Sequence, residues 1–121
     1  MKHTFPKGTV MTAKAKLKLH GVTETVFNIV IRKEQYNQGR GLALIADEAN
    51  GQPFCTLSIN IVSDANQPCA LPSSKLPLDH CYFKTWSENE GFMEQLEAQG
   101  LIKQNGPRHQ YTGAQIVKVL F

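Results

Sequence analysis

The chain has 121 residues, of which 41% are hydrophobic and 19% charged, and its net charge is +3. This length and ordinary apolar content predict one globular domain over residues 1–121 and exclude a disordered chain. No apolar run approaches the roughly 18 residues of a membrane-spanning helix, and residues 1–10 lack the apolar core of a signal peptide. The composition therefore favours a cytoplasmic protein that does not contact a membrane.

The charge is unevenly distributed along the chain. Residues 1–46 hold eight Lys or Arg against two acids, whereas residues 47–121 hold five against eight acids. This asymmetry predicts one positive and one negative surface, and the positive one favours an anionic partner. Two solvated surfaces, or head-to-tail self-association, are the alternatives.

Two strands are predicted near the start of the chain. Residues 13–19 alternate apolar and polar side chains, and residues 21–33 are rich in β-branched residues. A two-residue turn at 20–21 would place the apolar side chains of the second strand on the same face as the lysines. A three-residue loop at 20–22 instead pairs Leu17 with Thr25 and keeps the apolar and polar side chains on separate faces. We favour the second register, because a one-residue slip exchanges the two faces of a strand.

Further strands are predicted at 42–46, 54–62, 80–86 and 114–121. Asn50-Gly51 marks a hairpin loop between the first two of these. Residues 63–79 contain three prolines and no periodicity, which predicts a long loop. The turn signals of residues 100–113 predict a connection.

One helix is predicted over residues 87–99. Ser87 and Glu90 have the spacing of a capping box, and Gly100 fits the residue that follows a helix. Trp86 precedes the box, so we expect a mostly buried, structural side chain that packs on the first helical turn.

The predicted fold class is α+β, with a single antiparallel sheet of five to six strands and the 87–99 helix packed on it. Phe92 and Leu96 are expected to face inward. In the chosen register Val26 and Val30 lie on the lysine side of the sheet. We expect the 63–79 loop, or a second subunit of a homodimer, to cover that side.

The residues do not predict catalysis, a cofactor or a metal site. The chain has no G-x-S-x-G motif, no phosphate-binding glycine loop and no ligand spacing among its four histidines. Cys55, Cys69 and Cys81 form no C-x-x-C pair, which favours reduced thiols, with the first and last buried in strands. His80 and Cys81 are adjacent in a strand and point to opposite faces, so Asp79-His80 is the better arrangement for a general base.

Three features are candidate binding sites. They are the row Lys14, Lys16 and Lys18, then Arg40 between two glycines, and finally Arg108 with Tyr111 in a glycine-bounded loop. Lysines on a strand face can meet phosphates, and arginine beside an aromatic ring is a common anion contact. The structural alternatives are an edge strand kept soluble by lysine, a plain turn and a solvent loop.

Residues 39–121 resemble a small domain family of unknown function that plasmids, phages and integrated elements carry. The resemblance rests on "TLSINI" at 56–61, Phe83-Lys84-Thr85, Gly100-Leu101 and Thr112-Gly113. The chain departs from the family by an insertion-like segment at 62–79 and by Lys84, where an acid is common. The family has no assigned catalytic residues.

The resemblance implies the biology of mobile elements, whose small accessory proteins often disarm host defence. The expected function is therefore a non-enzymatic protein that binds and inhibits a host defence component, as anti-CRISPR proteins do. The alternative is a binding module or sponge for a phosphate-bearing ligand, either a signalling nucleotide or a nucleic acid.

Overall fold

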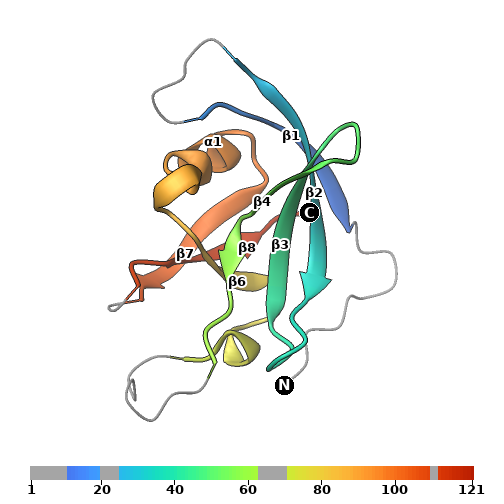
Figure 1. Cartoon of the computed structure of the whole chain (residues 1–121). Helices are drawn as coiled ribbons and strands as arrows, with labels where there is room; N and C mark the ends of the chain where they lie inside the picture. Colours follow the sequence, from blue (N-terminus) through green and yellow to red (C-terminus); the bar gives the residue numbers. More distant parts are fainter. Residues whose placement is uncertain (1–10, 20–24, 63–70, 110–111) are drawn as a thin grey trace.

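The computed structural model describes residues 11–19, 25–62, 71–109 and 112–121 (Figure 1). The first sheet has the order β1-β2-β3-β4, and the second has the order β5-β6-β8-β7, with every neighbouring pair antiparallel. The strands are β1 (Thr12–Leu17), β2 (Phe27–Gln35), β3 (Leu42–Glu48), β4 (Pro53–Thr56), β5 (Ser58–Ile59), β6 (His80–Phe83), β7 (Ile102–Arg108) and β8 (Gln115–Val119). The helical elements are the 3-10 turns η1 (Ser73–Lys75) and η2 (Ser87–Asn89) and the helix α1 (Phe92–Ala98). Within the described ranges, no helix is long and apolar enough to span a membrane.

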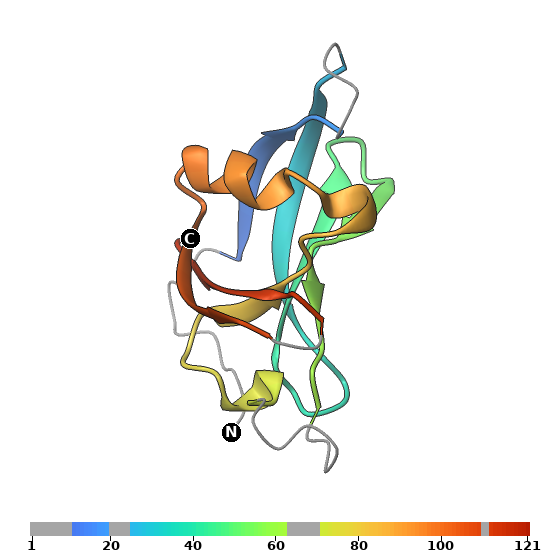
Figure 2. The ribbon, with the colours of Figure 1, turned by 90° about the vertical axis from the view of Figure 1, so that its left-hand side faces the viewer.

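The α+β composition is confirmed, but the prediction of a single sheet of five to six strands is wrong. The predicted strand at 54–62 bends at Leu57, so that β4 belongs to the first sheet and β5 to the second. The Leu57 N–H donates to the Leu44 carbonyl at 2.9 Å, while the Leu57 carbonyl accepts from the Lys84 N–H at 2.7 Å. Figure 2 shows the two sheets crossing at a steep angle, an arrangement whose corners are made by strands that change sheet.

The strand β7 was not predicted, because Asn105-Gly106-Pro107 reads as a turn. Ile102 pairs with Val119, and the register then shifts between Gln104 and Arg108. An edge strand tolerates proline and glycine at such an irregularity. Gly106 has a φ of 150°, and a Cβ there would lie 3.1 Å from that of Ile116, so both the backbone conformation and the close approach of the two strands favour glycine.

The faces of β1 and β2 are predicted correctly, but their register is wrong by two residues. Leu17 pairs with Phe27 rather than with Thr25, and Lys14 pairs with Val30. A slip of two residues leaves every side chain on the same face, since side chains alternate with a period of two. The turn itself, residues 20–24, lies outside the described residues.

The predicted helix is broken into η2 and α1. Gly91 adopts a left-handed conformation with φ of 85° between them, and neither element has a side-chain hydrogen bond at its start. The predicted capping box is therefore not formed, and Ser87 itself has a positive φ of 59°. The end of the helix is as predicted, because Gly100 has a φ of 76°. Its N–H donates to the Glu97 carbonyl at 3.0 Å, as expected for a residue that ends a helix.

Trp86 is not the mostly buried residue that the capping-box reading predicted. Its side chain is 37% exposed. The Lys84 Nζ lies 6.0 Å from the centre of its ring and also donates to a Glu88 carboxylate oxygen at 2.8 Å. The predicted helix does not continue from Trp86, because η2 ends at Asn89 and α1 begins only at Phe92.

The core lies between the two sheets and is closed by α1. Phe92 and Leu96 face inward as predicted and are fully buried. The Phe54 ring lies 6.0 Å from the Phe92 ring and 5.1 Å from the Phe27 ring, which links α1 to the first sheet. The other side of the core is formed by residues of the second sheet, including Phe83 and Val117.

Candidate binding groove on the first sheet

The three lysines of the predicted binding row lie on the outer face of the first sheet, two of them on β1 and Lys18 directly after its last residue. Lys14, Lys16 and Lys18 are exposed, while Ala15 and Leu17 between them are buried in the core. β1 is an edge strand of the first sheet. None of the three lysines forms an ion pair with any residue that the structure describes.

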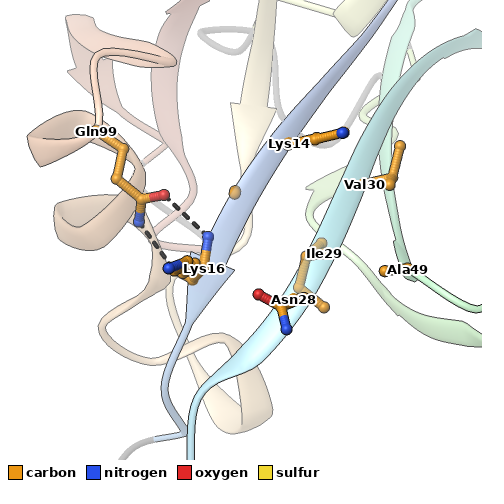
Figure 3. A pocket seen from close by; sticks show the side chains of 8 residues that line it. Lys14, Lys16, Asn28, Ile29, Val30, Ala49 and Gln99 are labelled. Carbon is orange, nitrogen blue, oxygen red and sulfur yellow. Dashed lines mark hydrogen bonds between the residues drawn. The ribbon is translucent and has the colours of Figure 1, made fainter.

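A groove of about 590 Å³ crosses this outer face (Figure 3). Its lining comes from β1, β2, the residue after β3 and the residue after α1: Lys14, Ala15, Lys16, Asn28, Ile29, Val30, Ala49 and Gln99. Lys14 and Lys16 stand on one side, and Val30 and Ala49 supply apolar surface on the opposite side. Among the residues that the structure describes, the lining contains no acid, no arginine and no aromatic ring.

The exposed edge of β1 beside the groove is held by two glutamines of the helix segment. The Gln99 side-chain amide accepts from the Lys16 N–H at 2.9 Å and donates to the Lys16 carbonyl at 2.7 Å. Gln95 makes the same pair of bonds to Lys18, at 2.8 and 2.9 Å. The two amides thus occupy the place of a neighbouring strand and fix the backbone that carries the lysines.

The opposite flank of α1 reaches the edge of the second sheet. A Glu97 carboxylate oxygen accepts from the Gln104 N–H of β7 at 2.9 Å. Successive helical residues are about 100° apart, so Gln95 and Gln99 share one flank, Glu97 lies on the other, and Leu96 points inward between them. Figures 1 and 2 show α1 in the gap between β1 and β7. This role was not predicted, although Gln95, Glu97 and Gln99 alternate on either side of an inward Leu96, which is the sequence signal for it.

The other predicted binding residues do not join the groove. Arg40 is exposed in the turn between β2 and β3, at the far end of the first sheet from α1 (Figure 1). The guanidinium of Arg108 donates to the Gly113 carbonyl at 3.0 Å and to the Thr85 hydroxyl at 3.3 Å, which gives it a structural role in the 109–114 loop. Tyr111 lies outside the described residues.

Arg32 also lies on the outer face, but its charge is neutralised. It donates to Asp47 at 2.8 Å and forms an ion pair of 2.5 Å with Glu34. The positive charge of this part of the sheet is therefore concentrated on β1.

The predicted cover of the lysine side is not found in the described part of the 63–79 loop. The Ser73 hydroxyl accepts from the Ile61 N–H at 2.8 Å, and the Leu71 carbonyl accepts from the Tyr82 hydroxyl at 2.8 Å. These bonds hold residues 71–79 against β6 and the end of the β5 segment. Residues 63–70 lie outside the described part of the chain. Val26 is 45% exposed.

The suggested general base is not assembled. The ring nitrogens of His80 contact the Leu78 carbonyl through Nδ1 at 3.0 Å and the Asn105 amide through Nε2 at 2.8 Å. Because a carbonyl only accepts, Nδ1 carries the proton and Nε2 accepts from Asn105. Asp79 does not bond the ring, and its Oδ1 is buried without a partner among the described residues. The described residues also contain no group of three metal-ligating side chains.

Two of the thiols are held in their protonated form. Burial raises the pKa of Cys81 and of Cys55 to about 12, far above the ordinary value of 9.0. Cys81 is fully buried and Cys55 half-buried, whereas Cys69 lies outside the described residues. Neither described cysteine is a thiolate nucleophile near neutral pH.

These pKa values predict an unusual loss of stability in alkali. Burial also raises the pKa of Tyr36 to about 12, so this tyrosine and the two thiols ionise in the unfolded chain before they ionise in the folded protein. Between about pH 9 and pH 12 the free energy of unfolding should therefore fall, by at most ~1.4 kcal/mol per pH unit for each fully buried group. Lys33 acts in the opposite direction, because burial lowers its pKa.

The measurement is urea unfolding in a reducing buffer from pH 8 to pH 11. Cys81→Ala loses some packing at every pH, but its stability should decline less steeply than that of the original protein. Parallel curves for the two proteins would contradict the assignment to Cys81.

The fold and the groove define a small α+β domain of two antiparallel sheets closed by one helix, with a basic groove beside that helix. Comparison with protein-family models, curated proteins and solved structures finds no match for this chain.

Proposed function

We propose that this chain is a non-enzymatic binding protein that uses the groove on β1 and β2 to engage a negatively charged partner. The observation that carries the proposal is the row of three exposed lysines, which have no acidic partner among the described residues, beside a groove that also has apolar surface from Val30 and Ala49. Protection of an edge strand does not explain the lysines, because the Gln95 and Gln99 amides already cover the edge of the strand at Lys16 and Lys18. Edge protection would also not require the groove beside them.

The biological role that we propose is inhibition of a host defence component. It is supported by the resemblance of residues 39–121 to a domain carried by phages and plasmids. A stoichiometric inhibitor needs an accessible, rigid surface rather than catalytic groups, and the β1 backbone is held rigid from the helix side by two glutamine amides. A phosphate-bearing ligand is the second candidate, since the same lysine row can meet phosphates.

Charge reversal tests the groove directly. The double variant Lys14→Glu/Lys16→Glu should bind the partner at least about tenfold more weakly, because two attractive charges become repulsive. The matched control is Lys103→Glu/Lys118→Glu, which makes the same change of net charge at two exposed, paired positions of β7 and β8. The control should bind as the original protein does.

The measurement is capture from a bacterial lysate, followed by mass spectrometry of the bound proteins and of the bound small molecules. Equal capture by the groove variant and the original protein would contradict the proposal. Binding through several phosphate contacts would weaken steeply with salt, whereas a protein interface with an apolar centre would weaken less.

A further inference from the structure

We infer that the groove takes an acidic protein segment in an extended conformation, with carboxylates at alternate positions. The inference rests on the proposed function, because it names the partner of the same groove. Three properties of the groove support it: the spacing of the lysines, the amide of Asn28, and the absence of aromatic and arginine side chains from the lining that the structure describes.

The spacing of the lysines fits an extended chain. Lys14 and Lys16 project from the same face of β1, two residues apart, which corresponds to about 6.6 Å along a strand. Side chains at alternate positions of an extended segment have the same spacing and also point to one side. Two carboxylates of such a segment can therefore meet both lysines without a bend in its backbone.

Asn28 lies opposite Lys16 in the sheet, and its side chain is part of the groove (Figure 3). This amide has no hydrogen-bond partner among the residues that the structure describes, whereas the Gln99 amide is occupied by Lys16. A side-chain amide offers one donor group and one acceptor, which matches a peptide unit. A phosphodiester has no hydrogen-bond donor, so it could use the NH₂ group of Asn28 but not its carbonyl oxygen.

The remaining lining favours protein over nucleic acid. Single-stranded nucleic acids bind to aromatic side chains on which their bases stack, and arginine forms the bidentate contacts that select phosphate. The described lining of the groove has neither. Val30 and Ala49 instead present aliphatic surface, which the methylene groups of glutamate side chains can cover.

The test is nuclear magnetic resonance of the full ¹⁵N-labelled chain with synthetic probes. Added Ac-Glu-Ala-Glu-Ala-Glu-NH₂ should shift the backbone amides of residues 14–16 and 28–30, with a Kd on the order of 10 mM for two or three exposed ion pairs. The matched peptide with glutamine in place of each glutamate should bind at least about tenfold more weakly. Lys14→Glu/Lys16→Glu should lose the response, and Lys103→Glu/Lys118→Glu should keep it.

A further variant separates peptide recognition from simple charge attraction. Asn28→Ala should weaken binding of the acidic peptide about threefold while leaving the weak response to inorganic phosphate unchanged, because the amide meets the peptide backbone and not the charges. An equal loss of binding for both probes would contradict the contact between the Asn28 amide and the peptide backbone.

Two results would overturn the inference. One is a tighter response of the same amides to an oligothymidylate or to inorganic phosphate than to the acidic peptide. The other is the absence of a response to the acidic peptide at 10 mM. If capture from the lysate still depended on Lys14 and Lys16 in either case, the proposed function would stand and only the class of partner would be wrong.

Discussion

Replacing Phe92 with alanine is expected to lower the free energy of unfolding by ~3–5 kcal/mol. The Phe92 ring is fully buried where α1 meets both sheets, and it lies 6.0 Å from the Phe54 ring. Alanine there removes the transfer free energy of the ring and leaves a cavity that the surrounding strands fill only in part. Because α1 also holds the edges of β1 and β7, we expect the loss to affect the whole domain.

Chemical denaturation measures this loss, and Glu94→Ala is the matched control in the same helix. Glu94 is exposed, so its replacement should change stability by no more than ~0.5 kcal/mol. A loss below about 1 kcal/mol for Phe92→Ala would show that the helix does not close the core.

Replacing Lys33 with alanine is expected to cost ~3–5 kcal/mol. Lys33 is only 2% exposed and projects from the core-facing side of β2. Its Nζ donates to the main-chain oxygen of Phe121 and lies 5.2 Å from the centre of the Phe121 ring. Alanine removes the buried stem, and it also leaves that oxygen and the nearby Asp79 carboxylate without the positive charge.

A comparison with Lys33→Met separates the two contributions. Methionine keeps an unbranched stem of similar length but removes the ammonium group, so we expect it to cost about 2 kcal/mol, less than alanine. Equal stabilities of the original protein and Lys33→Ala in urea unfolding would show that the buried contacts of Lys33 contribute nothing.

The candidate site shows which of its residues a local sequence pattern can predict. The alternation of residues 13–19 predicts that Lys14, Lys16 and Lys18 are exposed, and the structure agrees. The groove beside them also needs Asn28, Ala49 and Gln99, which come from distant parts of the chain. No local pattern relates these three residues to the lysines, because only the pairing of β1 with β2 and the docking of α1 bring them together.

Trp86 shows the opposite case, in which a local pattern predicts burial for a side chain that the structure leaves exposed. Lys33 was not predicted as a core residue, yet its position in the alternation of β2 directs it into the core. A tryptophan before a predicted capping box reads as buried, yet the break at Gly91 removes the helical turn that would cover it.

The sequence by itself determined the properties that depend on a few neighbouring residues. These are the faces of β1 and β2, the inward side of α1 and the end of that helix at Gly100, all of which follow from side-chain periodicity or from one backbone conformation. Only the tertiary structure decided the division into two sheets, the pairing of β7 with β8, the register of β1 on β2 and the place of α1 between two strand edges. Each of these depends on which backbone groups, far apart in the chain, hydrogen-bond to one another. A shift of two residues or a bend at Leu57 changes those partners and leaves the local pattern of polar and apolar side chains the same.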